Sequence, residues 1–153
     1  MKSRVLQVVT GIVVLLILIQ FFPVDRSVPS TEADKDFLNM HKPNHETAML
    51  VINACYDCHS YKTNYPWYSK LAPVSWWMQS HVDEGRENMN FSLWGNYTDN
   101  RADHKLEEAI DLIEAEEMPL PVYVWAHSGA HLNEQERKEL INYLASLRTY
   151  HDE

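Results

Sequence analysis

Two cysteines and a histidine are the residues of this 153-residue chain with the most specific chemistry. They stand in the run Cys55-Tyr56-Asp57-Cys58-His59, and the sequence contains no other cysteine. Thiols three positions apart lie about one helical turn apart, so each can form a thioether to one vinyl group of a haem. The imidazole that follows then lies close to the iron and can serve as its proximal ligand. The spacing therefore predicts covalent haem c, attached through Cys55 and Cys58 and ligated by His59.

Paired cysteines also occur in thioredoxin-like redox sites and in zinc sites. A redox pair of that kind follows a strand and opens a helix, and a zinc site needs a second pair of ligands at close spacing. Neither context surrounds Cys55 and Cys58. The haem interpretation is therefore favoured.

The element that must position the motif is a helix in front of it. Asn44 is a suitable cap for a helix that begins at His45. An apolar face at positions i, i+3, i+4 and i+7 would then carry the first cysteine of the motif. Its members are Ala48, Val51, Ile52 and Cys55.

Three residues are candidates for a distal iron ligand. Met118 precedes Pro119 in a segment that two prolines stiffen, so its thioether has little entropy left to lose, which suits a weak iron–sulfur bond. Met78 and His81 are rivals, because they share an apolar face with Val74, Trp77 and Val82. We expect the helix that carries this face to begin at Pro73-Val74-Ser75, with Ser75 as its cap.

The segment Ser60 to Tyr68 is rich in aromatic residues and has no helical period. Trp67 and Tyr68 are expected to line the haem edge or to donate hydrogen bonds to its propionates, with ordinary loop packing as the alternative.

Further elements surround these residues. We expect a loop over 90–100 with buried aromatic residues, a helix over 101–117, a loop over 122–132 and a last helix from Asn133, which stands at capping-box spacing from Glu136. The apolar residues expected to be buried by these elements are Phe91, Trp94, Tyr97, Leu106, Ala109, Ile110, Ile113, Leu140, Tyr143, Leu144 and Leu147.

The N-terminus is predicted to be a membrane anchor. A basic head, Met1 to Arg4, precedes 18 residues from Val5 to Phe22 that are almost wholly apolar, close to the minimum for a ~30 Å hydrocarbon core. No small-residue cleavage pattern follows, so an uncleaved anchor is favoured over a signal peptide. The basic head predicts a cytoplasmic N-terminus and an exported domain. We therefore expect an anchor over 1–24, a tether over 25–43 and a haem-binding domain over 44–153.

The chain is acidic, with a formal net charge of −9. After Arg26 there are 10 Lys and Arg against 21 Asp and Glu, so the charge of that part is −11. Binding to nucleic acid needs cationic groups that replace counterions, so a nucleic-acid partner is disfavoured. The charge suits transient docking with a basic partner.

Several runs together resemble one family. These are Cys55 to His59, Tyr65-Pro-Trp-Tyr68, Ala72-Pro-Val-Ser-Trp76, Glu84-Gly-Arg86, Asn90-Phe-Ser92 and Met118-Pro-Leu-Pro121. They are similar to the single-haem haem-binding domain family of bacterial membrane-anchored or exported proteins and, more broadly, to class I c-type cytochromes. The resemblance covers residues 45–148. It implies an all-α, cytochrome c-like fold, one haem c and Met118 as the distal ligand.

The function that these features predict is one-electron transfer at the outer face of a bacterial inner membrane, with membrane-associated redox proteins as partners and no catalytic residue. A tether raises the effective concentration of such partners without a tight interface. A peroxidase would need an open distal site and an acid–base residue, for which His81, His127 and His131 are available. A gas or redox sensor would need a displaceable Met118.

Overall fold

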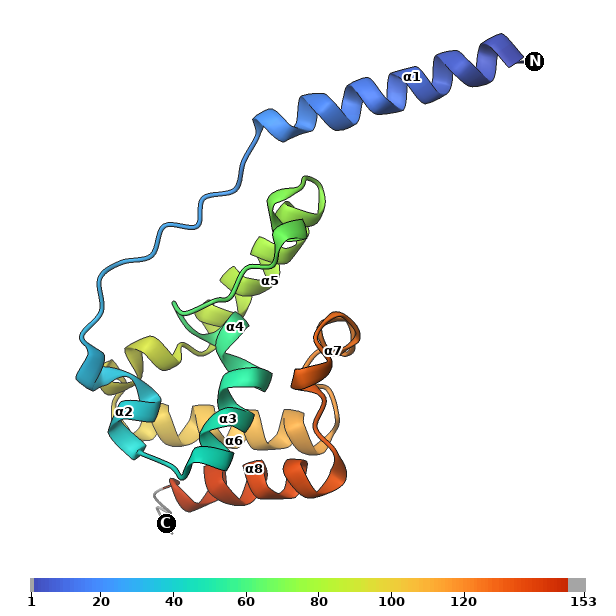
Figure 1. Ribbon diagram of the computed structural model, residues 1–153. Helices are drawn as coiled ribbons and strands as arrows, with labels where there is room; N and C mark the ends of the chain where they lie inside the picture. Colours follow the sequence, from blue (N-terminus) through green and yellow to red (C-terminus); the bar gives the residue numbers. More distant parts are fainter. Residues whose placement is uncertain (1, 149–153) are drawn as a thin grey trace.

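The computed structural model describes residues 2–148, and every regular element in that range is helical (Figure 1). The all-α prediction is therefore confirmed. The α-helices and shorter 3₁₀ or π turns are α1 (Lys2–Leu18), η1 (Ile19–Phe21), η2 (Ala33–Lys35), α2 (Phe37–His41), α3 (His45–Val51), η3 (Ile52–Tyr56), α4 (Asp57–His59), η4 (Trp67–Lys70), α5 (Val74–Asn88), η5 (Phe91–Asn96), α6 (Asp99–Glu114), α7 (Pro121–Ala126), η6 (Ser128–Ala130) and α8 (Glu134–Ser146).

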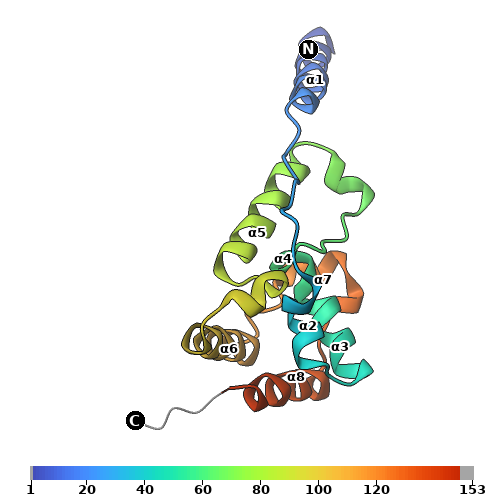
Figure 2. The same ribbon diagram turned by 90° about the vertical axis from the view of Figure 1, so that its left-hand side faces the viewer.

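Helix α1 stands apart from the body of the molecule (Figures 1 and 2). The span Ser3–Phe21 has 19 residues and a mean hydropathy of 2.2, and it is not buried in the body of the molecule. At 1.5 Å per residue it is about 28 Å long, close to the thickness of a hydrocarbon core. In the described part of the chain it is the one helix long and apolar enough to cross a membrane, and a signal sequence has the same properties.

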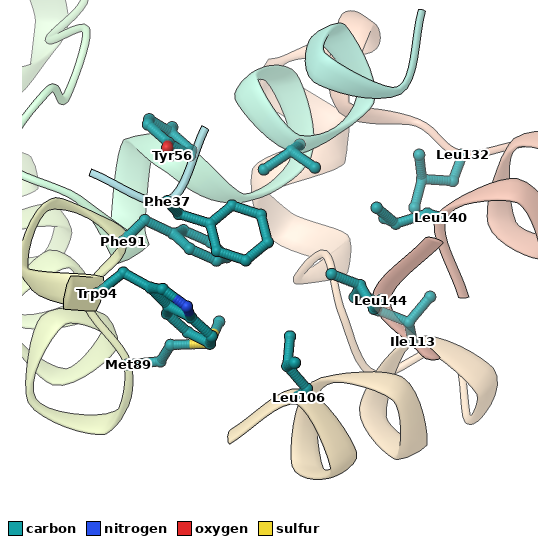
Figure 3. Close-up of a cluster of buried hydrophobic side chains, with 11 residues drawn as sticks. Phe37, Tyr56, Met89, Phe91, Trp94, Leu106, Ile113, Leu132, Leu140 and Leu144 are labelled. Atoms are coloured by element: carbon teal, nitrogen blue, oxygen red, sulfur yellow. The ribbon is translucent and has the colours of Figure 1, made fainter. Parts of the chain in front are cut away.

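The core of the domain lies between the motif-bearing helix and the pair α6 and α8, with α2 and η5 on its other side (Figure 3). Aromatic rings fill one half: Phe37 lies 4.7 Å from Phe91 and 4.9 Å from Trp94, measured between ring centroids. Aliphatic side chains of α6 and α8 fill the other half (Figure 3). The buried residues of this cluster are Phe37, Val51, Tyr56, Met89, Phe91, Trp94, Leu106, Ile113, Leu132, Leu140 and Leu144.

Capping residues begin these helices where the sequence predicts. The Asn44 side chain accepts the Thr47 N–H at 2.9 Å, so α3 begins at His45. Asn133 and Glu136 form a capping box at the start of α8. Side-chain oxygens at these positions satisfy N–H groups that have no partner within the helix. The caps predicted at Asn44 and Asn133 are therefore confirmed.

The expected tether over 25–43 is wrong in its second half. Residues 33–41 form η2 and α2, and Phe37 is completely buried at the centre of the aromatic cluster. Asp36 is buried too and accepts the Tyr56 hydroxyl at 3.0 Å, so this segment is bonded directly to the motif-bearing helix. A five-residue helix is too short to show an apolar period, so the sequence pattern did not predict it.

Helix α5 also differs from the prediction. Pro73 occupies the cap position without a side-chain hydrogen bond, and Ser75 is buried inside the helix. Of the predicted apolar face, Val82 in the second half of the helix is buried, whereas Val74 and Trp77 in the first half are exposed. The reason is visible in Figure 1, where the first half of α5 projects beyond the body.

The loop expected over 122–132 is also wrong in part, because it contains most of α7. This helix begins at Pro121, a residue suited to the first helical turn.

Candidate functional site

The motif lies on two irregular turns at the end of α3. Cys55 stands in the π turn η3, and Cys58 and His59 stand in the short helix α4. A π turn inserts one residue per turn and is frequent at functional sites. It also rotates the helix face, so Ile52 is exposed and the predicted face of Ala48, Val51, Ile52 and Cys55 is wrong at this one position.

Two adjoining cavities open beside the motif. The inner cavity, of about 80 Å³, is lined by Cys55, His59 and Met118 together with core residues such as Leu140. The outer cavity, of about 580 Å³, is lined by Cys58, His59 and Met118 and extends to Tyr123. His59 and Met118, 59 positions apart in the sequence, thus line both cavities. The fold brings together the four residues that the sequence analysis proposed for haem: Cys55, Cys58, His59 and Met118.

The His59 ring is held in a defined orientation. Its Nδ1 lies 2.9 Å from the carbonyl oxygen of Gly85 and 3.2 Å from that of Met89. Carbonyl oxygens only accept hydrogen bonds, so Nδ1 is the protonated nitrogen and Nε2 keeps its lone pair. Burial lowers the pKa of His59 below its usual value, which keeps the ring neutral. A neutral imidazole with its second nitrogen hydrogen-bonded to a carbonyl is the form in which histidine binds metals.

Gly85 brings α5 into direct contact with the motif. A Cβ atom at this position would lie 2.8 Å from the carbonyl oxygen of Cys58 and 3.2 Å from its Cβ. Real Cβ atoms do not approach backbone oxygens so closely, so only glycine permits this packing. The absence of a side chain therefore lets the Gly85 carbonyl reach His59.

The two cysteines lie in surroundings that keep them as thiols. Burial raises the pKa of Cys55 to about 12 and that of Cys58 to about 11. Redox-active cysteines are thiolates in electropositive surroundings, so a thioredoxin-like redox pair is disfavoured. Within residues 2–148, no three His, Cys, Asp or Glu side chains gather closely enough to hold a metal ion by themselves.

Hydrogen bonds fix the middle and the end of the motif. Asp57 accepts the Asn64 N–H at 2.8 Å through Oδ1 and the Tyr123 hydroxyl at 2.7 Å through Oδ2. Arg86 donates to the Ser60 carbonyl at 2.8 Å and to the Thr63 hydroxyl at 2.9 Å. Helices α7 and α5 therefore hold the motif from two directions. The sequence analysis did not identify Tyr123, Gly85 or Arg86 as site residues.

The rival distal ligands are placed differently from Met118. Met78 lines a third cavity, which we call the α5–α7 groove, but neither cavity that His59 lines. His81 lines both the groove and the outer cavity, and its Nδ1 lies 2.8 Å from the Trp77 carbonyl oxygen. The placement therefore favours Met118 and leaves His81 as the rival.

Trp67 and Tyr68 lie away from the cavities that His59 lines. Trp67 is 75% exposed. Tyr68 lines the α5–α7 groove, which has a volume of about 520 Å³, and its hydroxyl lies 3.3 Å from His127 Nε2. Tyr68 shares this groove with Cys58, so it reaches the neighbourhood of the motif, whereas Trp67 points to solvent.

The residues around the motif fit a haem. The larger cavity has the volume of a typical cofactor site, and apolar groups such as Ala54, Leu112 and Leu120 supply much of its lining. Two thiols, one oriented imidazole and one thioether would supply the attachment points and the metal ligands. The polar residues Asn88, Glu108 and Asp111 share the same lining, so one cavity offers a mainly apolar wall together with polar groups.

Comparison with known proteins agrees with this chemistry. The sequence model of a family described as "haem-binding domain" matches residues 14–146. The match begins within α1 and includes the segment expected to be a tether. Searches of curated proteins and of solved structures returned no match.

Proposed function

Because the chain belongs to the haem-binding domain family, we propose that it is a membrane-anchored c-type cytochrome that carries single electrons. The observation that carries the proposal is the convergence of His59 and Met118 on the same two cavities, beside both cysteines. An electron carrier needs two side chains that can bind the iron. It does not need a path by which a substrate reaches the metal.

Each residue has a defined role in this proposal. Cys55 and Cys58 would hold the haem as thioethers, and the His59 nitrogen and the Met118 sulfur would bind its iron. Bound haem supplies a ferric–ferrous couple, and a thioether ligand beside imidazole favours the ferrous state and raises the reduction potential. Gly85 and Met89 hold the imidazole in place through their carbonyl oxygens.

The apolar lining of the inner cavity would also raise the reduction potential. Leu140 is fully buried, Ile113 and Leu132 are nearly so, and all three face the inner cavity. They exclude water from the metal ligands and provide low-dielectric surroundings, which disfavour the additional charge of the oxidised state.

The proposed location follows from α1. The basic residues Lys2 and Arg4 precede the apolar span, which favours a cytoplasmic N-terminus and an exported domain in the inner membrane of a bacterium. Redox proteins of the same membrane are the proposed partners. The acidic charge of the domain suits transient docking with a basic surface.

A sensor or a peroxidase is the alternative, and one observation favours it. His81 lines the outer cavity together with His59 and Met118, so the proposed distal ligand shares its cavity with a second histidine. That arrangement would support chemistry at the metal if Met118 dissociated.

The test is spectroscopic. The ferric protein should show the weak near-infrared charge-transfer band of a methionine–iron bond, and Met118→Ala should lose it and gain carbon monoxide binding in the ferrous state. Met78→Ala is the matched control and should keep the band. Persistence of the band in Met118→Ala would refute the ligand assignment. Rapid carbon monoxide binding and peroxide turnover by the unaltered protein would replace the carrier with the enzyme.

A further inference from the structure

The end of the domain near α1 carries an unusual concentration of exposed apolar side chains. Trp125 on α7 is 88% exposed, and Trp67 is 75% exposed. The surface that they form, here called the aromatic end, flanks the α5–α7 groove. Its members are Trp67, Leu71, Val74, Trp77, Val122 and Trp125.

The aromatic end is bonded directly to the chain that leaves α1. The Gln20 side chain donates to the Ala72 carbonyl at 3.0 Å and accepts the Ala72 N–H at 2.9 Å. The Trp76 indole donates to the Phe22 carbonyl at 2.8 Å. Gln20 lies within the apolar span and Phe22 directly follows it. The loop before α5 is therefore held at the point where the chain would leave a bilayer.

The direction of α1 places the same surface on the bilayer side. In Figure 1, α1 runs from above the domain toward the right, and α7 and the projecting half of α5 lie on that right-hand side of the body. A bilayer that contains α1 therefore lies on the side of the aromatic end. Helices α6 and α8 lie at the opposite end of the molecule from α1 in both views (Figures 1 and 2).

The distribution of charge also favours contact between the aromatic end and a bilayer. The sequence has 22 acidic residues, but none stands between Asp57 and Asp83 or between Glu117 and Glu134, the two segments that form the aromatic end. Lys70 lies in the first of them; Lys62 lies there too, but its Nζ is paired with the Asp36 carboxylate at 2.8 Å. Anionic lipid headgroups repel carboxylates and attract lysines, so this end meets less repulsion from a bilayer than the acidic segments of the chain would.

We propose that the aromatic end lies in the headgroup region of the bilayer that contains α1, so that the domain rests on the membrane instead of moving freely on a tether. Tryptophan is enriched in that region, where its ring contacts acyl chains and its N–H stays among polar groups. The occupant of the α5–α7 groove is then the apolar part of interfacial lipid. This inference rests on the membrane anchoring proposed above.

The experiment is photo-crosslinking of the full-length, haem-loaded chain. A benzophenone amino acid replaces Trp67, Val122 or Trp125 in turn, and replaces His104 of α6, which is also exposed, as the matched control. Each protein is irradiated in native membranes and in vesicles of phosphatidylethanolamine and phosphatidylglycerol, and adducts are identified by mass spectrometry. Lipid adducts at the three aromatic-end positions and none at His104 are expected.

Two results would overturn the inference. Equal lipid labelling at all four positions would show no preferred orientation, and protein adducts in place of lipid at the aromatic end would identify a protein-docking surface. The visible and near-infrared spectra of the same samples test the haem and its ligands separately. Loss of the methionine band with lipid adducts retained would refute the electron carrier and leave the membrane contact standing.

Discussion

Replacement of Gly85 by alanine tests the link between α5 and the motif. The new Cβ would stand 2.8 Å from the Cys58 carbonyl oxygen, which is backbone and cannot rotate away. Overpacking of this kind costs about 1–3 kcal/mol, and the close backbone contact places Gly85→Ala near the upper value. Alanine recovers about 1 kcal/mol through its higher helix propensity. The expected net loss of unfolding free energy is therefore about 2 kcal/mol.

The assay is thermal unfolding of the full-length protein in detergent, followed by far-ultraviolet circular dichroism. For a chain of this size, 1 kcal/mol corresponds to about 2–4 °C, so Gly85→Ala should lower Tm by about 4–8 °C. Gly129→Ala is the control, because no atom lies within 4 Å of the place that a Cβ would occupy there, and its Tm should stay close to that of the unaltered protein. Both substitutions add one methyl group, so their difference reports the contact with Cys58 together with the gain in helix propensity at Gly85.

The same variant has a second readout. If α5 moves outward, the 2.9 Å hydrogen bond from His59 Nδ1 to the Gly85 carbonyl lengthens. A weaker hydrogen bond makes the imidazole less basic and the oxidised metal less stable, so the reduction potential should rise. An unchanged Tm together with an unchanged potential would refute the reasoning about Gly85.

Two further predictions concern stability. Tyr123→Phe removes the 2.7 Å hydrogen bond to Asp57 Oδ2 and should cost about 1.5–3 kcal/mol in denaturant unfolding, the usual range for a bond to a charged group; an unchanged midpoint would contradict the role of α7. His41 has a buried Nε2 without a hydrogen-bond partner, and burial lowers its pKa below 6.5. The unfolded chain therefore binds the proton more readily, so this contribution to stability is complete above pH 6.5 and is lost as the pH falls through that value toward the lower folded pKa. His41→Gln should flatten the Tm–pH profile below pH 6.5, and an equally steep profile would show that other groups cause the slope.

The sequence was sufficient for the parts of the site that depend on spacing. The motif, the cap at Asn44, the capping box at Asn133 and the apolar stripes of α6 and α8 are local patterns, and the structure contains each of them. Met118, which was proposed from a stiff Met-Pro segment, lines the same two cavities as His59, and its ligation of iron stays a prediction.

The features that could not be predicted from the sequence depend on contacts between segments that are far apart in the chain. Gly85 stands in the middle of a helix, where glycine is unfavourable, and that was the available signal that another backbone passes close by. Phe37 gave no periodic signal because its helix has five residues. The exposure of Val74 and Trp77 followed from the length of α5 beyond the body, which no pattern within α5 specifies.

The central claim is that one haem is bonded covalently to Cys55 and Cys58. The most direct measurement is the intact mass of the purified chain under denaturing conditions, with a pyridine haemochrome spectrum of the same sample. The account predicts a mass equal to the polypeptide plus one haem, and loss of that addition when both cysteines are replaced by alanine. A polypeptide mass without haem, with pigment that acidified organic solvent extracts, would contradict it.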